Sequence, residues 1–208
     1  MKQMIQELIA SGYLKTPAII EAFQKIDRRD FVPDELKEQA YLNVPLPIGY
    51  GQTISQPLTV AFMLELLEPK KGDRILEIGS GSGWQTALLS HIVGEGGKVF
   101  AIEVIPELMA FGKKNVSKYN FFKSGVAEFH HFNAIGGMPE KAPFDKIISA
   151  ASGAEVPAAW KEQLKTGGRI VAPVKESIRL MVKREDSPAG KFEEKNYPGF
   201  VFVPLVNG

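Results

Sequence analysis

A short loop carries two hydroxyl side chains without an obvious activating partner. Residues 49–57 read GYGQTISQP, which places Thr53 and Ser55 between glycines and a proline. A serine or threonine that attacks a substrate normally needs a base within hydrogen-bond reach. The nearest acidic residues in sequence are Glu38 and Glu65, and the three histidines lie at positions 91, 130 and 131. These hydroxyls therefore either cap a helix or serve a reaction that needs no activated serine.

Ser55 admits both interpretations, because Pro57 is expected to open a helix. A hydroxyl just before a helix can bind the free N–H groups of its first turn, and such a cap stabilises the helix by about 1 kcal/mol. The same place is the positive end of the helix dipole, where an O–H group and backbone N–H groups can hold a carboxylate. The residues alone favour the cap.

A second candidate site is the glycine-rich stretch EIGSGSG at residues 77–83. It lies between a short apolar run and a helical pattern, and in an open α/β sheet ligands bind at such a turn. Glycines let the backbone approach a ligand closely, and the following helix offers free N–H groups. A nicotinamide-binding loop would read G-x-G-x-x-G, whereas here the third glycine comes one residue early. The loop therefore favours a different ligand over a dinucleotide.

S-adenosylmethionine fits these residues better, because its amino-acid end suits a compact glycine loop and its ribose needs an acidic partner. Glu103 ends the next predicted strand and is the ribose candidate, since a carboxylate can accept from both hydroxyls. Glu77 is placed to help hold the ammonium group. Asn133 is either a contact for the adenine amino group or only a turn residue. A tight connection without any ligand is the alternative for the whole loop.

Alternating strands and helices must position these residues. Apolar runs predict strands, and periodic patterns predict helices, so the chain from residue 57 reads as a doubly wound α/β fold with a mostly parallel sheet. The expected strands are 74–79, 98–103, 126–132, 144–149 and 169–174, and the expected helices begin at 57, 81, 106 and 157. After residue 175, apolar segments around the turn 186–191 predict antiparallel strands at one edge, the last being FVFVPL at 200–205.

The N-terminal part reads as a helical addition. Ile5, Leu8 and Ile9 share one helical face, and Thr16 and Pro17 suit the start of a second helix. A loop rich in proline follows. We therefore predict one domain over 1–208, in which 1–56 form a helical addition and active-site loop, 57–175 a donor-binding α/β core, and 176–208 C-terminal antiparallel strands.

Composition excludes several classes of function. With 208 residues and 44% hydrophobic content, the chain can bury one core. A net charge of +1 gives no electrostatic footprint for nucleic acid, and the absence of cysteine excludes disulfides and thiolate metal sites. His130 and His131 are neighbours on a predicted strand and point to opposite faces, so no metal site is expected. Without a signal peptide or an apolar run near ~20 residues, we expect a cytoplasmic monomer with no membrane partner.

Seven segments, in order over nearly the whole chain, resemble the protein-L-isoaspartate O-methyltransferases: AFQKIDRRDFVP, PLPIGYGQTISQP, RILEIGSGSGWQTALLS, VFAIEVIPEL, GGMPEKAPFDKII, GGRIVAPV and FVPL. The glycine loop is common to class I S-adenosylmethionine-dependent methyltransferases, which are Rossmann-like, whereas GQTISQP is far more specific. The resemblance implies methyl transfer from S-adenosylmethionine to the free carboxylate of isoaspartyl residues in damaged proteins and peptides, which starts repair through a methyl ester and a succinimide.

That reaction would explain the opening loop, because the acceptor carboxylate, with an ordinary pKa of about 4, is already ionised and needs no base. The resemblance implies that Ser55 is the active-site serine, which orients the carboxylate without forming a covalent intermediate. It also implies a donor site made of Gln52, Thr53, Ile54, Ser55, Glu77, Gly79, Ser80, Gly81, Ser82, Gly83, Trp84, Glu103, Asn133 and Ala134. The segment FVFVPL resembles one that closes near the substrate pocket, although its residues alone read as an apolar strand.

Three departures from the family pattern lie near the predicted cleft. Phe132-Asn133-Ala134 stands where Gly-Asp-Gly is usual, Asn43 stands where an acid is common, and the run 149–152 reads SAAS where VTAA is frequent. Two alternatives therefore remain. One is a methyltransferase with another acceptor, although an enzyme acting on a base would be expected to show an Asn/Asp-Pro-Pro-aromatic motif, which KIISAASG lacks. The other is a donor-binding protein without catalysis.

Overall fold

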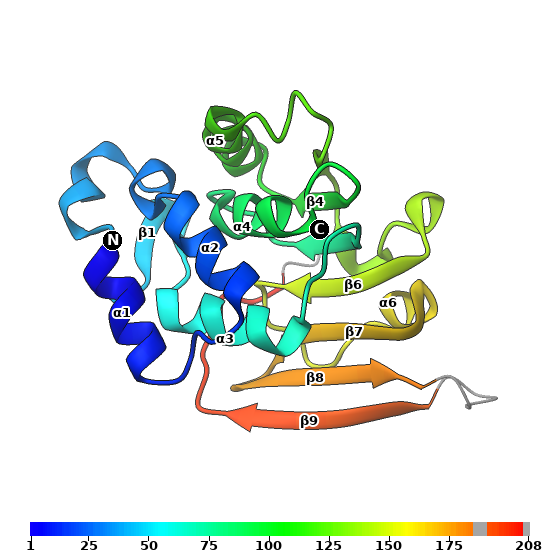
Figure 1. Cartoon of the computed structure of the whole chain (residues 1–208). Helices are drawn as coiled ribbons and strands as arrows, with labels where there is room; N and C mark the ends of the chain where they lie inside the picture. Colours follow the sequence, from blue (N-terminus) through cyan, green and yellow to red (C-terminus); the bar gives the residue numbers. More distant parts are fainter. Residues whose placement is uncertain (185–190, 206–208) are drawn as a thin grey trace.

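The apolar runs pair into one seven-stranded sheet in the computed structural model, which describes residues 1–184 and 191–205 (Figure 1). Its strand order is β5-β4-β3-β6-β7-β8-β9, and β3 to β7 run parallel while β8 and β9 are antiparallel. The bounds are β3 Arg74–Ile78, β4 Lys98–Glu103, β5 Ala127–His131, β6 Phe144–Ser149, β7 Leu164–Val174, β8 Ser177–Lys183 and β9 Phe192–Pro198. The predicted doubly wound α/β fold with antiparallel edge strands is confirmed.

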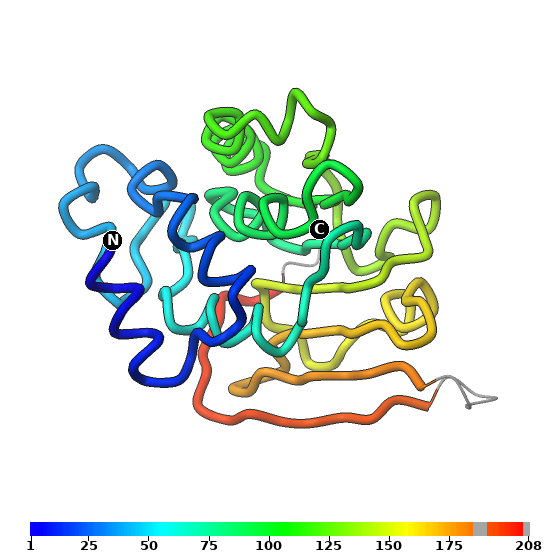
Figure 2. The backbone as a smooth tube through the Cα atoms, in the orientation of Figure 1, coloured from blue at the N-terminus to red at the C-terminus, as the bar shows by residue number. Residues whose placement is uncertain are grey.

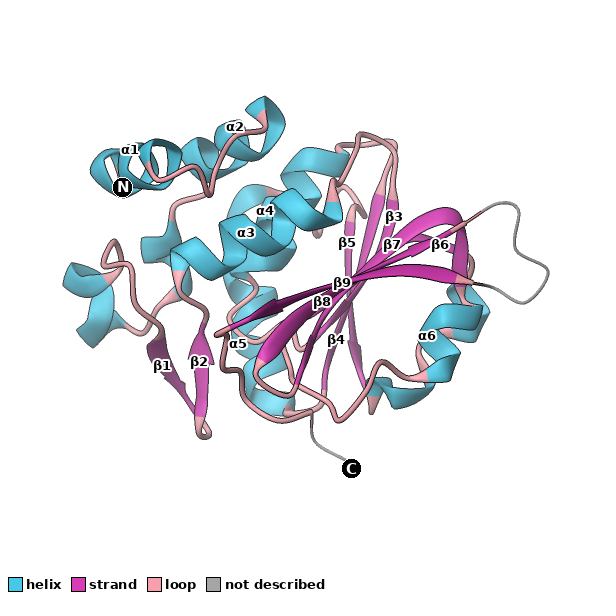
Figure 3. Ribbon diagram, turned by 90° about the horizontal axis from the view of Figure 1, so that it is seen from below, coloured by secondary structure: helices cyan, strands magenta, loops and turns pink. Residues whose placement is uncertain are grey.

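Helices cover both faces of this sheet. Figure 3 shows α3 and α4 on one side and α6 on the other. The bounds are α3 Pro57–Leu67, α4 Trp84–Val93, α5 Pro106–Val116 and α6 Ala158–Glu162. Neighbouring residues of one strand face opposite helical layers, as Ile75 and Leu76 do, because side chains alternate along a strand. This two-sided burial is why the strands read as continuous apolar runs.

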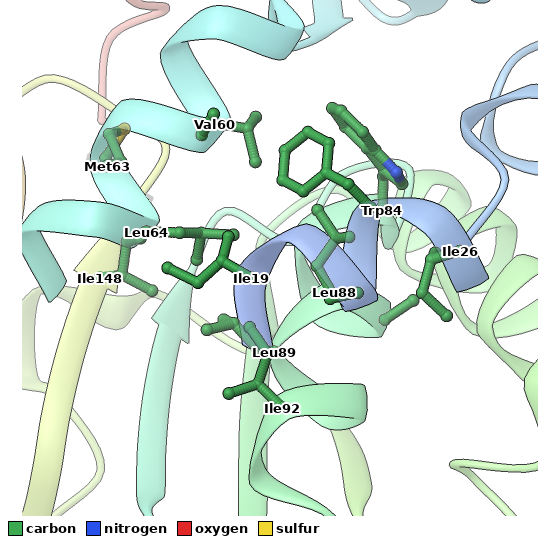
Figure 4. Packing of buried hydrophobic residues seen from close by; sticks show 14 of the residues in the cluster. Ile19, Ile26, Val60, Met63, Leu64, Trp84, Leu88, Leu89, Ile92 and Ile148 are labelled. Atoms are coloured by element: carbon green, nitrogen blue, oxygen red, sulfur yellow. The ribbon is translucent and has the colours of Figure 1, made fainter. Parts of the chain in front are cut away.

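The N-terminal residues form two helices, α1 Lys2–Ala10 and α2 Pro17–Lys25, followed by short 3-10 helices. In Figure 4, Ile19 and Ile26 of this segment pack against Leu88 and Leu89 of α4. The addition therefore shares a core with the sheet. Of the three residues expected on one face of α1, Ile5 and Leu8 are buried and Ile9 is exposed, while Met4 is also buried.

The segment predicted as a loop before α3 contains a β-hairpin. Strands β1 Leu46–Gly49 and β2 Gln52–Ile54 pair antiparallel, and the two residues between them, Tyr50 and Gly51, both have positive φ, as in tight hairpin turns. The sequence predicted a loop here because prolines are unusual within strands. Pro47 is tolerated because a two-stranded ribbon leaves its outer edge without a hydrogen-bonding partner.

The segment 200–205 is not the strand that its apolar residues predict. After β9 it leaves the sheet edge and crosses the ends of the parallel strands, as the red tube in Figure 2 shows. Its main-chain hydrogen bonds go to two residues. Phe200 N–H donates to Glu176 O (3.2 Å), Ser152 N–H donates to Val203 O (2.8 Å), and Leu205 N–H donates to Ser152 O (2.8 Å). The Phe62 ring of α3 stacks on Phe200 at 5.3 Å. The turn predicted at 186–191 falls almost wholly outside the described residues.

No helix within residues 1–184 and 191–205 is long and apolar enough to cross a membrane.

Candidate active site

A cavity of about 340 Å³ opens at the carboxyl ends of β3 and β4. Its wall combines the hairpin β1–β2, the start of α3, the glycine loop, the loops after β4, β5 and β6, and the C-terminal segment. Such volumes are typical of small-molecule sites. The lining residues with polar side chains are Gln52, Thr53, Ser55, Gln56, Thr59 and Glu103, and the apolar ones include Ile48, Ile105, Leu108, Phe132, Ala150, Val201 and Phe202.

The glycine loop forms the floor of this cavity. Gly79 and Gly81 line it, and both have positive φ, 77° and 48°, which side chains with a Cβ rarely adopt. Gly83 serves packing instead, since a Cβ there would lie 2.8 Å from the Gly112 carbonyl oxygen on α5. Ile102 O accepts hydrogen bonds from the N–H groups of Gly79 (2.9 Å) and Ser80 (3.1 Å). The loop is therefore fixed to the end of β4.

Glu103 is held rigidly at the cavity wall. Its Oε2 accepts from the Gly81 N–H (2.9 Å), and its Oε1 accepts from the N–H groups of Val104 (2.9 Å) and Ile105 (3.1 Å). The side chain is nearly buried yet lines the cavity. Three fixed donors orient the carboxylate, and its remaining lone pairs can accept from a ligand. This geometry suits the ribose contact predicted from the sequence.

Glu77 lies behind the glycine loop rather than at the cavity wall. It is fully buried, and the Gln85 Nε2 donates to its Oε1 at 3.2 Å. Its Oε2 has no hydrogen-bond partner among the described residues. Burial raises the pKa of Glu77 to about 7, an effect that the nearby Thr86 hydroxyl and the Gln85 amide partly offset. Direct contact with a donor's ammonium group stays a prediction.

A smaller cavity of about 40 Å³ adjoins the main one beside the glycine loop. Ser80, Ser82, Trp84 and Ile54 line it, and Thr53 and Ser55 line both cavities. The Ser80 Oγ is buried without a hydrogen-bond partner among the described residues. A polar space of this size has room for an ordered water.

Ser55 does not cap α3. The N-cap residue is Gln56, which makes no side-chain cap bond, and the first-turn N–H of Leu58 donates to Asn43 Oδ1 at 3.0 Å. Gln56 Nε2 in turn donates to the Asn43 backbone oxygen at 2.9 Å. The preference for a cap at Ser55, drawn from the residues alone, is therefore wrong. Ser55 lines the cavity, and the cap oxygen comes from Asn43, 15 positions before Leu58.

Asn133 is used in a turn. Its Oδ1 accepts from the Ile135 N–H at 3.0 Å and starts a 3-10 helix at Ala134. Phe132 and Ala134 line the cavity, whereas Asn133 does not. The geometry favours the turn over the adenine contact, which stays a prediction. His130 and His131 belong to no cluster of three or more metal-binding side chains in the described parts of the chain.

Sequence reasoning missed the apolar part of the wall. Phe132, Ile105 and Val201 each lie at the end of a strand or beyond it, and an apolar side chain there reads as core. Two signals were available: the departure from the family pattern at Phe132 and the resemblance of FVFVPL to a segment near the substrate pocket. Phe132 and residues 201–205 do line the cavity.

Comparison with known proteins shows which family this chain resembles. A family model described as protein-L-isoaspartate(D-aspartate) O-methyltransferase matches residues 1–208. Among proteins named protein-L-isoaspartate O-methyltransferase, that of Ignicoccus hospitalis is 41% identical over 207 residues, covering 99% of this chain and 96% of the relative. That of Pyrococcus horikoshii is 41% identical over 212 residues, covering 99% and 92%.

Solved structures agree with the fold. One is a Plasmodium falciparum protein described as a protein-L-isoaspartate O-methyltransferase, in complex with S-adenosyl-L-homocysteine. It superposes with a TM-score of 0.87 at 22% identity, covering 99% of this chain and 97% of the other. A structure named protein-L-isoaspartate O-methyltransferase gives 0.88 at 27% identity, covering 99% and 66%. From the match over its full length and the identity to these relatives, this chain belongs to the protein-L-isoaspartate(D-aspartate) O-methyltransferase family.

Proposed function

We propose that this chain transfers the methyl group of S-adenosylmethionine to the free carboxylate of L-isoaspartyl residues in damaged proteins and peptides. The methyl ester then leads to repair through a succinimide. The observation that carries the proposal is the family match over residues 1–208, with relatives about 40% identical along nearly the whole chain. The cavity adds support, because it contains the fixed carboxylate of Glu103 and also Ser55, which does not cap α3.

The residues at the cavity fit S-adenosylmethionine. Glu103 offers a preoriented acceptor for ribose hydroxyls, and the loop Gly79–Gly83 lets a ligand approach the backbone closely. The orphaned Glu77 Oε2 and Ser80 Oγ lie around the loop, where the polar amino-acid end would bind. Once bound, the donor supplies a sulfonium methyl group that is already electrophilic.

The protein's remaining task is to position the acceptor. A carboxylate with a pKa of about 4 is ionised at pH 7, so no residue has to remove a proton. Ser55 donates its O–H to one carboxylate oxygen and aims the other at the methyl carbon. That oxygen forms the new bond as the carbon–sulfur bond breaks and its electron pair stays on sulfur. Orientation of this kind is worth up to about 7–11 kcal/mol of barrier.

A methyl-transfer assay tests the proposal. The protein is incubated with methyl-labelled donor and either an isoaspartyl peptide or its aspartyl twin of the same sequence. We expect label in the isoaspartyl peptide alone, released as methanol on mild alkaline treatment because the product is an ester. Label in neither peptide, with donor binding intact by calorimetry, would instead indicate a donor-binding protein without catalysis.

Location and assembly are part of the proposal. We infer a cytoplasmic monomer that takes damaged proteins and peptides as substrates and has no nucleic-acid partner. The net charge of +1 supports the last point, since phosphate backbones recruit strongly basic surfaces. Light scattering coupled to gel filtration checks the monomer: a mass near 22.9 kDa is expected, and one near twice that value would contradict it.

A further inference from the structure

A fully buried cation lies behind the wall of the active-site cavity. The Arg28 guanidinium donates to four backbone carbonyl oxygens: those of Ala40 (2.6 Å), Leu42 (3.3 Å), Val44 (3.0 Å) and Ser55 (3.1 Å). Only arginine has a planar fork with enough donors for such a set. One side chain thereby ties the segment before the hairpin to the residue that follows it.

This cation has no acidic partner within the described residues. Asp27, its neighbour in sequence, accepts instead from the Tyr41 hydroxyl (2.9 Å) and the Arg29 N–H (2.9 Å). The Arg28 Nε has no hydrogen-bond partner there either, and the guanidinium carbon lies 5.2 Å from the centre of the Trp84 ring. Burial lowers the pKa of Arg28 to about 10, so the side chain stays charged at neutral pH.

An uncompensated buried charge is costly, and carbonyl dipoles offset only part of that cost. An anion bound on the other side of Ser55 would supply the missing counter-charge. Ser55 lies between Arg28 and such an anion, since its carbonyl oxygen contacts Arg28 and the residue also lines the cavity.

The contact also fixes the direction of a peptide unit. Because a trans peptide is planar, its C=O and N–H groups point in opposite directions. With the Ser55 carbonyl bound to Arg28, the N–H of Gln56 points away from the guanidinium. Gln56 lines the same cavity as Ser55. Arg28 therefore sets the orientation of two donors, the Ser55 hydroxyl through its backbone and the Gln56 N–H through the shared peptide.

We propose that Arg28 is a positioning residue for the acceptor: it fixes the Ser55–Gln56 peptide and provides the counter-charge for the acceptor carboxylate. The inference rests on the proposed function and extends it to a residue that does not itself line the cavity. Acceptor and sulfonium charges both disappear as the ester forms, so this counter-charge favours the bound ground state at least as much as the transition state. Its loss should raise the acceptor KM more than it lowers kcat.

Two substitutions at Arg28 separate charge from fold. We expect Arg28→Met to raise the KM for an isoaspartyl peptide by at least about tenfold, the effect of losing a charged hydrogen-bonding group. The Kd for adenosylhomocysteine, read by calorimetry, should change by less than about threefold, because Glu103 and the glycine loop, which would bind the donor, are held by contacts other than Arg28. Arg28→Lys restores the charge but not the contact with all four carbonyls, so it should recover part of the acceptor KM.

Arg29→Met is the matched control. Arg29 is the neighbouring arginine, half exposed, and its ion pair with Glu38 lies on the surface (2.6 Å). The same substitution there should leave the acceptor KM unchanged. The inference is wrong if Arg28→Met leaves the acceptor KM near that of the wild-type protein, or if Arg28→Lys is no better than Arg28→Met.

A measurement on the unmodified protein covers the case in which Arg28→Met does not fold. The complex with adenosylhomocysteine is titrated with an isoaspartyl peptide and with its twin in which that carboxylate is a carboxamide. We expect the carboxylate to bind at least about tenfold more tightly. Equal binding of the two peptides would contradict the proposal that Arg28 provides a counter-charge for the acceptor carboxylate. Absence of wild-type turnover on the isoaspartyl peptide would instead refute the proposed function, so the two failures are distinguishable.

Discussion

At the scale of single residues, Ser55 differs from a serine nucleophile in what surrounds it. Among the described residues no histidine lines its cavity, and the one carboxylate there, Glu103, is already engaged by three backbone N–H groups. A serine in this setting can orient a group that is already charged but cannot be activated for attack. The acceptor must therefore bring its own nucleophile, as a carboxylate does.

Ser55→Ala should lower kcat by roughly two to three orders of magnitude, as the loss of one positioned donor does in other sites. The melting temperature should stay within about 1–2 °C of the wild-type value, since Ser55 makes no cap bond and surface-like substitutions are nearly neutral. Initial rates measure kcat, and thermal denaturation measures the melting temperature. A large loss of stability would return Ser55 to a structural role.

Glu77 makes the stability of the protein depend on pH. Its pKa is about 7 in the folded chain and about 4.5 in the unfolded one, because burial disfavours the charged form. From about pH 4.5 upward the unfolded state loses the proton first, so stability falls as pH rises and levels off above about 7. The full difference is on the order of 3 kcal/mol.

Glu77→Gln should remove this decline. The variant and the wild-type protein should be equally stable near pH 4, and the variant should be the more stable one near pH 8 in the absence of ligand. Urea denaturation at both pH values measures this. Glu77 does not titrate in this range if the free energy of unfolding changes from pH 4 to pH 8 by the same amount in the wild-type protein and in the variant.

At the scale of elements, the junction between the hairpin and α3 is organised from outside the helix. Asn43 supplies the cap oxygen, and Arg28 binds the carbonyl of Ser55, so both contacts come from the N-terminal segment. Within the part of the chain that the structure describes, the Ser55 side chain at the helix start is thereby left without a cap bond. This arrangement explains why a local sequence pattern assigned the cap to the wrong residue.

Asn43→Ala should lower the free energy of unfolding by about 1 kcal/mol, the usual effect of removing a helix cap. Asn43→Asp should retain the stability, since a carboxylate oxygen also accepts from the Leu58 N–H. Chemical denaturation of both variants beside Ser55→Ala tests the assignment. Equal destabilisation by Asn43→Ala and Ser55→Ala would contradict it.

At the scale of the whole molecule, the cavity joins distant parts of the chain. The hairpin side contributes Gln52 and Ser55, the core contributes Gly79 and Glu103, and residues 201–205 close the wall. A ligand that fills the cavity would contact all three and should stabilise them together. Adenosylhomocysteine at about 100 times its Kd should raise the free energy of unfolding by about 2.7 kcal/mol.

Hydrogen exchange with and without adenosylhomocysteine should show this coupling. We expect slower exchange in peptides covering 52–59, 79–83 and 201–205, because bound ligand suppresses local opening of the surrounding wall. Peptides from β9, at the far edge of the sheet, serve as the internal control. Protection confined to 79–83 would mean that the hairpin and the C-terminal segment take no part in donor binding.

The sequence predicted the core of this fold well, because buried strands such as 98–103 and 144–149 carry an unambiguous apolar signal. It also singled out Glu103, whose place follows from the end of a strand. It failed where contacts between segments distant in sequence determine the local structure. The cap at Asn43 and the four carbonyls at Arg28 depend on segments that meet only in space.

The closing role of residues 201–205 has a consequence for biosynthesis. A ribosome makes this segment after the hairpin, the glycine loop and all seven strands of the described sheet. A growing polypeptide can therefore fold its sheet while the pocket still lacks one wall, and it should remain inert toward damaged proteins until residues 201–205 emerge. Competence for repair would then arrive only after the sheet that supports the pocket has formed.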